Sequence, residues 1–580
     1  MEHGVPTRVP GAVVYPPLNS ARVTSVSRHD EAAGAPPGAG ERDGSRWNTA
    51  TARVTLRRHW LFALLFTLGL LLRVMAQVAY QPVILYFDSP RYLHNAYWLN
   101  PNGPDPLGYL VALRILLDAF HSLALLATFN HLLGLGVAGL IYAVLLRRGV
   151  KPWMAALAAG PVLLDGLQLL IEQMVMSEPL FQFFVVLGIA LLLWRPRPNP
   201  MLAAGAGLAF AAAGLTRYVG LSLVVVGLLF CVLAAGSRFV PRLVTAAALL
   251  AGFALPVIGY AADNYAVNGT FSVPRGTVST GLYARVAASV NCAGLSLPAY
   301  ERPLCPPRGV VKPMGGSLIQ GYSLGTTSPL RTYRPPAGET IHQVTNDFVK
   351  RAVLQQPLPV ARSIGGSLVR PFLSWSRDHR PGELPVERWQ FHTTFPLYFT
   401  RLSRWLFHRW EGHGPVINRP VARLLRGYQL YLGYTPGPVL LACAVLALVA
   451  GLGVGRARRS GQQLACLLWL GAGFSLLLAA DLYQFSWRYQ LPTLVTIPPA
   501  AALALSALTS PRPAREPSAE HEPGGLDDPG RGVPDDGAAS HDPPQAEPAG
   551  GTAHSSEPAE PSLAQHHLYP GNPPDPGRYP

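Results

Sequence analysis

The sequence predicts an all-α protein that crosses a membrane about ten times, and three observations support this fold class. First, the chain of 580 residues is 49% hydrophobic but only 14% charged, whereas a soluble globular protein is about 25% charged. Second, its apolar residues come in long runs without charge, such as Leu61–Leu72 and Leu243–Ala262. Third, runs near 20 residues match the roughly 30 Å of hydrocarbon in a bilayer.

Ten apolar runs give the predicted spans, and the segments around them give the predicted domains. The spans are 59–80, 122–146, 152–170, 179–195, 200–216, 218–236, 240–262, 436–455, 461–481 and 489–509. The first seven form an N-terminal membrane module, 57–262, and the last three form C-terminal membrane helices, 436–509. An extracytoplasmic loop region, 263–435, separates the two groups, with expected helices at Thr340–Leu354 and Val360–Phe372.

The two ends of the chain lack the periodicity of a packed helix. Residues 1–56 are rich in Gly, Pro, Ala and Arg, and residues 510–580 are rich in Pro, Gly, Glu, Asp and His. Such segments cannot bury a core, so we predict a disordered cytoplasmic N-terminus and a disordered cytoplasmic tail.

The basic residues of the short loops predict the orientation of the chain. With Arg57 and Arg58 anchoring the N-terminus in the cytoplasm, alternation of the spans puts every short basic loop on the cytoplasmic side, as the positive-inside rule requires. Those loops contain Arg147, Arg148, Lys151, Arg195, Arg197, Arg238, Arg242, Arg456, Arg458, Arg459, Arg512 and Arg515. The sequence therefore predicts a multi-pass protein of the plasma membrane with both termini in the cytoplasm.

Composition and motifs exclude several classes of function. The basic residues behind the net charge of +15 flank the spans instead of forming one face, which excludes a nucleic-acid partner. The sequence has no Gly-rich phosphate loop, which argues against an enzyme driven by ATP or a nucleotide sugar. It also has no Cys and His cluster with zinc spacing. We therefore predict no cofactor, and a divalent metal has no support in the residue pattern.

The predicted outer loops hold distinctive polar residues. The first contains Asp88 and two amphipathic segments, Ser89–Leu99 and Leu107–Phe120, which we predict to be helices in the membrane interface. The large loop contains Cys292 and Cys305, the only cysteines outside the spans. Because the predicted outer compartment is oxidising, we expect a disulfide between them.

Short stretches along the chain resemble a known family. They are Tyr86–Leu93, Asn130–Leu135 followed by Arg147 and Arg148, Glu172–Phe181, Leu215–Arg217, and Arg488–Pro492. Their order and placement resemble the GT-C superfamily of polyprenyl-phosphate-dependent glycosyltransferases, nearest its family 39 branch of protein mannosyltransferases and lipid A aminoarabinose transferases. The likeness covers about 55–510. The acidic motif of this family is often a pair of adjacent carboxylates, and Ser89 takes the second position here.

The resemblance implies an inverting membrane glycosyltransferase. It would move a hexosyl or pentosyl group from a polyprenyl-phosphate donor to a glycan, protein or lipid acceptor on the extracytoplasmic face. This reaction needs a base for the acceptor hydroxyl and cations for the departing phosphate. Asp88 is the predicted base, and Glu178 is the second candidate catalytic carboxylate. In a simpler interpretation, Asp88 and Glu178 only cap helices. Asp88 is followed by Ser89 and Pro90, and Glu178 lies between Ser177 and Pro179, which are residues typical of a helix start.

Arg217 and Arg488 are the predicted ligands of the donor phosphate, because both lie on the outer side against the positive-inside trend. The alternatives are a snorkelling anchor for Arg217 and simple pairing with Asp481 for Arg488. Further candidate substrate contacts are Arg91, Tyr92, Glu172 and Tyr489. Of these, Glu172 is expected to be solvated, and Tyr489 could equally belong to the aromatic belt.

Two other classes of function suit a chain of this kind. A transporter or lipid flippase places ionisable groups near the bilayer midplane, often in repeated halves. No repeat is visible here, and most acidic residues lie at the outer ends of the predicted spans. Arg73 and Asp165 are the exceptions, because they lie inside the first and third predicted spans. A non-catalytic envelope protein would use its large loop to bind a partner.

Overall fold

The computed structural model describes residues 49–101, 105–234, 239–273, 278–306, 329–378, 386–394 and 401–509. The chain divides into two units, Met1–Arg512 and Pro513–Pro580, and all described residues belong to the first. The predicted tail, 510–580, and residues 1–48 of the predicted N-terminal segment lie outside the described residues. Nearly every regular element in the described ranges is a helix, which confirms the all-α class.

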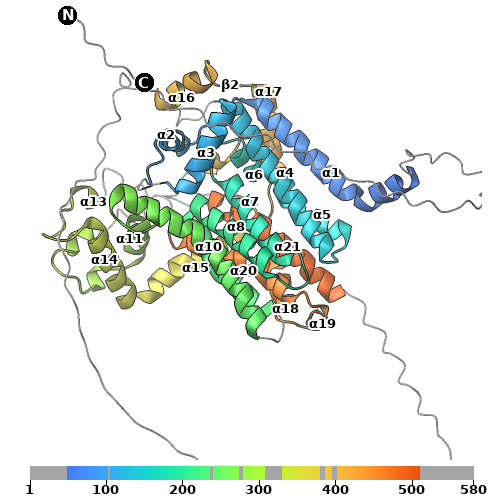
Figure 1. Ribbon diagram of the computed structural model, residues 1–580. Coiled ribbons are helices and arrows are strands. Elements are labelled where there is room, and N and C mark those ends of the chain that lie inside the picture. Colours follow the sequence, from blue (N-terminus) through green and yellow to red (C-terminus); the bar gives the residue numbers. More distant parts are fainter. Residues whose placement is uncertain are drawn as a thin grey trace, which may run out of the picture. The chain divides into compact units, whose positions relative to one another are not determined.

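Helices form at each predicted span (Figure 1). They are α1 (Thr49–Ala79), α4 (Leu123–Arg147), α5 (Pro152–Leu164) with α6 (Gly166–Glu172), α7 (Glu178–Leu193), α8 (Pro200–Thr216), η1 (Tyr218–Ser222) with α9 (Leu223–Ala234), α10 (Phe239–Asn268), α18 (Gly437–Gly451), α20 (Gln463–Asp481), and η5 (Trp487–Gln490) with α21 (Leu491–Thr509). Helix α1 begins before residue 57, so residues 49–56 are helical where we predicted disorder. The third span is broken, because α5 and α6 meet at Asp165 with a bend of 54°.

Five of these helices are long and apolar enough to cross a membrane on their own: α1, α4, α10, α20, and α21 with η5. The bent α5–α6 pair is a sixth candidate, and the other predicted spans form apolar helices of 10–17 residues. At 1.5 Å per residue, even the longest of these measures about 26 Å against about 30 Å of hydrocarbon. The polytopic membrane class is confirmed, and the count of ten spans stays a prediction.

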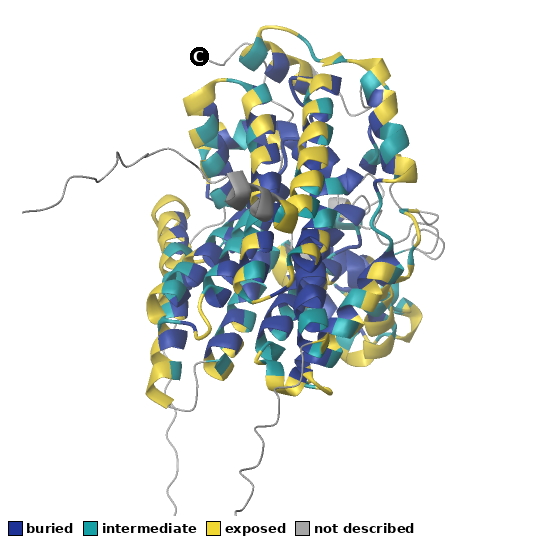
Figure 2. Ribbon diagram, turned by 90° about the vertical axis from the view of Figure 1, so that its right-hand side faces the viewer, coloured by how far each residue is buried: buried dark blue, intermediate teal, exposed yellow. Residues whose placement is uncertain are grey.

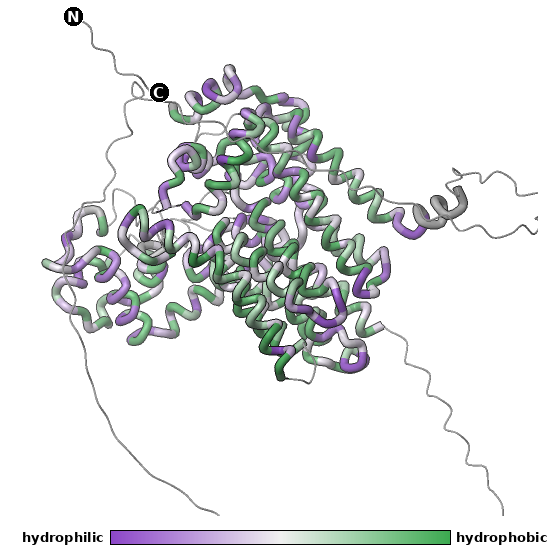
Figure 3. Tube along the Cα trace, viewed as in Figure 1, coloured by the Kyte–Doolittle hydropathy of each residue, from purple (hydrophilic) through white to green (hydrophobic). Residues whose placement is uncertain are grey.

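Helix α21 is the most buried of the candidate spans. Helices α5, α18 and α20 contact it, and Figure 2 shows buried residues concentrated inside the bundle. Apolar residues dominate these helices, as the green tube of Figure 3 shows. Helix α8 lies close against α10: a Cβ at Gly207 would lie 2.0 Å from the carbonyl oxygen of Leu249. Small residues at such crossings let two helix backbones approach.

The predicted outer loop region contains a second hydrophobic core. Its elements are α11 (Val278–Ser289), η2 (Cys292–Gly294), η3 (Arg302–Leu304), α13 (Pro329–Thr332), α14 (Ile341–Gln355) and α15 (Pro357–Leu373). Tyr283, Leu304 and Phe348 lie at the centre of this core. Helices α14 and α15 match the two expected in this loop, and α14 begins with a capping box formed by Thr340 and Gln343.

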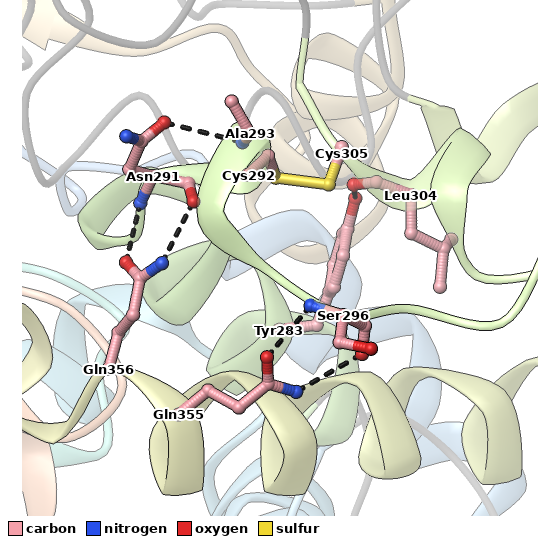
Figure 4. The surroundings of a disulfide bond; sticks show 9 residues. All are labelled: Tyr283, Asn291, Cys292, Ala293, Ser296, Leu304, Cys305, Gln355 and Gln356. Atoms are coloured by element: carbon pink, nitrogen blue, oxygen red, sulfur yellow. Dashed lines mark hydrogen bonds between the residues drawn. A yellow bond between two sulfur atoms is a disulfide. The ribbon is translucent and has the colours of Figure 1, made fainter.

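The segment around Cys292 is fastened to this core in two ways (Figure 4). Cys292 and Cys305 form a disulfide. The C-terminal end of α14 also holds this segment. Gln355, the last residue of α14, exchanges hydrogen bonds with the backbone of Ser296, and the C-cap residue Gln356 does the same with the backbone of Asn291. The disulfide therefore closes a loop that the neighbouring helix already holds.

Most of the remaining elements lie at one end of the membrane helices (Figure 1). They are β1 (Tyr80–Gln81), α2 (Ser89–Trp98), α3 (Leu107–Phe120), η4 (Val386–Trp389), α16 (Arg401–Glu411), β2 (Val416–Ile417) and α17 (Arg419–Tyr431). The short helix α19 (Ala457–Ser460) lies instead between α18 and α20 in the chain. Helices α2 and α3 form at the two predicted amphipathic segments. Strands β1 and β2 pair antiparallel, which ties the end of α1 to the loop region.

Candidate active site

Four charged residues that are far apart in the sequence meet in one cluster. Asp88 precedes α2, Glu178 begins α7, Arg217 follows α8, and Arg488 lies in η5. All four were predicted on the outer side, and the structure joins their side chains by ion pairs. We call these four residues the site cluster.

Arg488 is the centre of the site cluster. Its Nη1 lies 2.7 Å from Oδ2 of Asp88, and its Nε lies 3.4 Å from Oε1 of Glu178. Arg217 approaches the same Glu178 oxygen, at 2.6 Å from Nη1. Arg488 is 9% exposed and Glu178 is 3% exposed, so water screens these attractions weakly. Among the described residues, no ion pair joins Arg488 to Asp481, the partner considered in the alternative interpretation.

Asp88 does not act as a helix cap. Its backbone is in the αR region, and its side chain accepts no hydrogen bond from the first turn of α2. The carboxylate faces Arg488 instead, with Nη2 of Arg91 at 3.4 Å. Burial raises the pKa of the Asp88 carboxyl, but the charges of Arg488 and Arg91 outweigh burial and leave this pKa below its ordinary value. Asp88 is therefore ionised at neutral pH.

The cap predicted before α7 is also missing, because Ser177 makes no side-chain bond to the first turn of that helix. Its hydroxyl accepts a hydrogen bond of 3.1 Å from Nη1 of Arg217. Arg217 thus turns toward the site cluster, with contacts to Ser177 and Glu178, rather than extending away as a snorkelling side chain would.

Aromatic rings line the two arginines. Both guanidinium groups lie near the ring of Tyr489, whose centroid is 5.3 Å from Cζ of Arg217 and 5.0 Å from Cζ of Arg488. Its hydroxyl accepts a hydrogen bond from Nη2 of Arg488 at 3.2 Å. Arg488 also lies over Tyr86 and Trp389. These rings fix the guanidinium planes through cation–π attraction, and sequence reasoning gave neither Tyr86 nor Trp389 a role.

A small cavity opens beside the site cluster. It is lined by Glu178, Phe181, Gln182, Arg217, Val219, Leu476, Ala480, Arg488, Tyr489, Leu491 and Pro492. Two arginines, Glu178 and Gln182 supply its polar groups, and most of the other lining side chains are apolar. An anionic head with an apolar chain suits such a lining.

Arg91 and Tyr92 lie near the site cluster but do not line the cavity. Arg91 makes a bidentate contact to Asp105 at 2.8–3.0 Å, and Asn95 donates to the same carboxylate. Tyr92 is buried, with its ring edge-on to Tyr109 at 5.1 Å. These contacts hold α2 against the start of α3, so both residues support the position of Asp88.

Glu172 was expected to be solvated, and that expectation is wrong. Its side chain is fully buried, with Oε2 at 2.8 Å from Nε of Arg73 and at 3.0 Å from Nδ1 of His131. Gln168 donates to its other oxygen at 3.0 Å. The bend between α5 and α6 turns Glu172 into the bundle. We call Arg73, His131, Gln168 and Glu172 the interior cluster.

The interior cluster reaches the cavity through one pair of amides. Gln168 and Gln182 exchange two hydrogen bonds of 2.8 and 2.9 Å, and Gln182 lines the cavity. The cluster is tightly packed, because a Cβ at Gly134 would lie 2.0 Å from Oε1 of Glu172. Asp165, the other ionisable residue inside a predicted span, contacts Arg377 of the loop region at 2.7 and 2.9 Å.

Histidines do not gather at the site cluster. His131 belongs to the interior cluster. Across the described ranges, no three His, Cys, Asp or Glu residues lie close enough together to hold a metal ion.

The fold and the site cluster define a polytopic membrane protein with a charged cluster beside a small cavity, and comparison with known proteins shows a family that it resembles. Residues 115–266 match the family model of dolichyl-phosphate-mannose-protein mannosyltransferases, a family of the GT-C superfamily. This match confirms the predicted resemblance and indicates a membrane glycosyltransferase that uses a lipid-linked sugar. The matched range contains Glu178 and Arg217. No curated protein and no solved structure matches the chain significantly.

Proposed function

We propose that the protein transfers a hexosyl or pentosyl group from a polyprenyl-phosphate donor to a glycan, protein or lipid acceptor on the extracytoplasmic face of the plasma membrane. The observation that carries this proposal is the meeting of Asp88, Glu178, Arg217 and Arg488 beside one cavity whose lining combines charged and apolar side chains. The orientation, with both termini in the cytoplasm, rests on the basic short loops.

The two arginines bind the donor phosphate. Guanidinium groups match phosphate oxygens in geometry and charge, and they stay protonated. Arg217 and Arg488 line the cavity, and both contact the Tyr489 ring. Leu476, Ala480 and other apolar residues of the cavity wall then contact the first part of the lipid chain.

Asp88 acts as the base in a single displacement. The acceptor hydroxyl gives its proton to the Asp88 carboxylate while its oxygen forms a bond to the anomeric carbon. The bond from that carbon to the phosphate oxygen breaks, and its electron pair leaves with the phosphate. The charge that develops on this phosphate is stabilised by Arg217 and Arg488. One carboxylate suffices, because phosphate leaves without a general acid, and the configuration inverts.

Transfer is tested with purified full-length protein, a polyprenyl-phosphate donor labelled in its sugar, and an envelope fraction as acceptor source. We expect label to leave the lipid, to appear in the acceptor fraction, and to leave polyprenyl phosphate behind. Donor that stays intact with every acceptor fraction would contradict the proposal.

A lipid flippase is the second candidate, because the structure contains a membrane helix broken at an ionisable residue. Such breaks are frequent in transporters. Here Asp165 at the break is paired with Arg377, so it is not an open ion site. In reconstituted vesicles a flippase would move the labelled donor between leaflets without cleaving it, whereas a transferase consumes it.

A further inference from the structure

The carboxylate of Glu178 differs from the other paired carboxylates near it. Asp105, Asp165 and Glu172 each accept at least three directed hydrogen bonds. Neither oxygen of Glu178 has a directed hydrogen bond within the described part of the chain, although the side chain is 3% exposed. Asp481 shares this property but does not line the cavity.

Charge alone therefore holds Glu178 in place. Its Oε1 lies 2.6 Å from Arg217 and 3.4 Å from Arg488, the two cations that face the cavity. A buried charge without directed hydrogen bonds is poorly stabilised. The carboxylate occupies the position between two guanidinium groups that a bound anion would take.

Rearrangement is required when a phosphate enters this cavity. With Asp88 and Glu178 against Arg217 and Arg488, the charges of the site cluster already balance. An added anion meets the negative charge of Glu178 at the arginines it needs. Glu178 has no directed hydrogen bond to lose in the described residues, whereas Asp88 accepts one of 2.7 Å from Arg488, so Glu178 is the carboxylate that is easier to displace.

We propose that Glu178 is an internal competitor of the donor phosphate, which must displace the carboxylate from Arg217 and Arg488 in order to bind. Glu178 thereby sets the affinity for the anionic head and disfavours anions too weak to replace it. This inference rests on the proposed function and gives Glu178 a binding role in place of the catalytic role predicted from the sequence.

The test measures equilibrium binding of polyprenyl monophosphate, the lipid product of the proposed transfer, to full-length protein in nanodiscs. Glu178→Gln keeps the size of the side chain and removes its charge. We expect its dissociation constant to fall at least about tenfold below that of the unaltered protein, because the competing charge is gone. Binding of polyprenol, which lacks the phosphate, should not change.

A pair of shorter variants controls for shape. Glu178→Asn and Glu178→Asp have the same length and differ in charge, so the Asn variant should bind polyprenyl monophosphate more tightly than the Asp variant. This pair also replaces Glu178→Gln if that variant does not insert. Asp118→Asn, which removes an exposed carboxylate of α3, should bind as the unaltered protein does.

Two outcomes would overturn the inference in different ways. If the unaltered protein binds polyprenyl monophosphate and neutral variants at position 178 bind no more tightly, Glu178 is not a competitor, and the proposed function stands. If neither the unaltered protein nor any neutral variant binds it, the donor assignment of the proposed function fails as well.

Discussion

The site cluster and the interior cluster use the same residue types for different purposes. Each pairs arginine with a buried carboxylate. In the interior cluster, Glu172 accepts hydrogen bonds from Arg73 and Gln168 and contacts His131. In the site cluster, Glu178 has ion pairs but no directed hydrogen bond in the described residues. A carboxylate with hydrogen bonds on both oxygens, such as Glu172, is held in place as part of the structure, whereas the Glu178 carboxylate beside the cavity has no such bonds in the described residues and can exchange its partners with a ligand.

The largest expected effect is on transfer, through Arg488. Arg488→Gln removes the cation that contacts Asp88 and Glu178 and that faces the cavity. Loss of one group that stabilises the developing charge typically costs about 10²–10³-fold in rate. Initial rates of sugar release should show this loss. A matched change, Arg114→Gln on the exposed face of α3, should leave the rate unchanged. Equal rates for both variants would contradict the phosphate-binding role.

The interior cluster should respond in stability. Glu172→Gln leaves Arg73 buried without its carboxylate, and breaking such a pair typically costs about 3–5 kcal/mol. We expect a lower unfolding temperature and less inserted protein, measured by thermal unfolding in detergent. The rate of transfer per folded molecule should stay near normal. A stable Glu172→Gln protein that transfers sugar slowly would show that the interior cluster takes part in the reaction.

The disulfide should have a smaller and more local effect. Replacing Cys292 and Cys305 together by Ser opens a loop with a sequence separation of 13, which costs about 3 kcal/mol on the loop-entropy model. Since Gln355 and Gln356 also hold this segment, we expect faster proteolysis of the loop region with little change in the membrane helices. Limited proteolysis with and without reductant measures this. Free thiols at both positions in protein isolated without reductant would contradict the pairing.

The smallest effect concerns pH. Because the pKa of Asp88 lies below its ordinary value, its carboxylate stays ionised until the pH falls through that low pKa. The part of the transfer rate that depends on this base is therefore lost only in strong acid. Arg91→Gln removes one of the cations that lower the pKa, so the acid limb of the rate profile should move to higher pH. An unshifted limb would show that another group controls it.

Much of this fold could be predicted because a membrane helix is recognisable from a local run of apolar residues. Apolar runs marked every helix of the bundle, and amphipathic periodicity marked α2 and α3. The meeting of Asp88, Glu178, Arg217 and Arg488 was expected from their common side of the membrane and from the family resemblance. The side of each residue depends on alternation of spans, which sequence reveals well.

The features that could not be predicted are contacts between residues far apart in the sequence, which depend on tertiary packing. Glu172 lies in a predicted outer loop, yet the bend at Asp165 buries it against Arg73, 99 positions earlier in the chain. Trp389 comes from a part of the large loop without any recognised motif, and it packs over Arg488. Local periodicity carries no information about such distant partners. For Asp88 and Ser177, the sequence pattern favoured helix caps. In the structure Asp88 pairs with Arg488 and Ser177 accepts a hydrogen bond from Arg217 instead.

The most direct test of the account is the transfer rate of Asp88→Asn. The substitution keeps the size of the side chain and removes the base. Because the carboxylate caps no helix and Arg488 keeps its ion pair with Glu178, the variant should insert at normal levels and melt near the normal temperature. Asp118→Asn, an exposed carboxylate in the same loop, is the matched control. We predict that Asp88→Asn transfers sugar at least about a hundredfold more slowly than the control. Near-normal transfer by well-inserted Asp88→Asn protein would contradict the account.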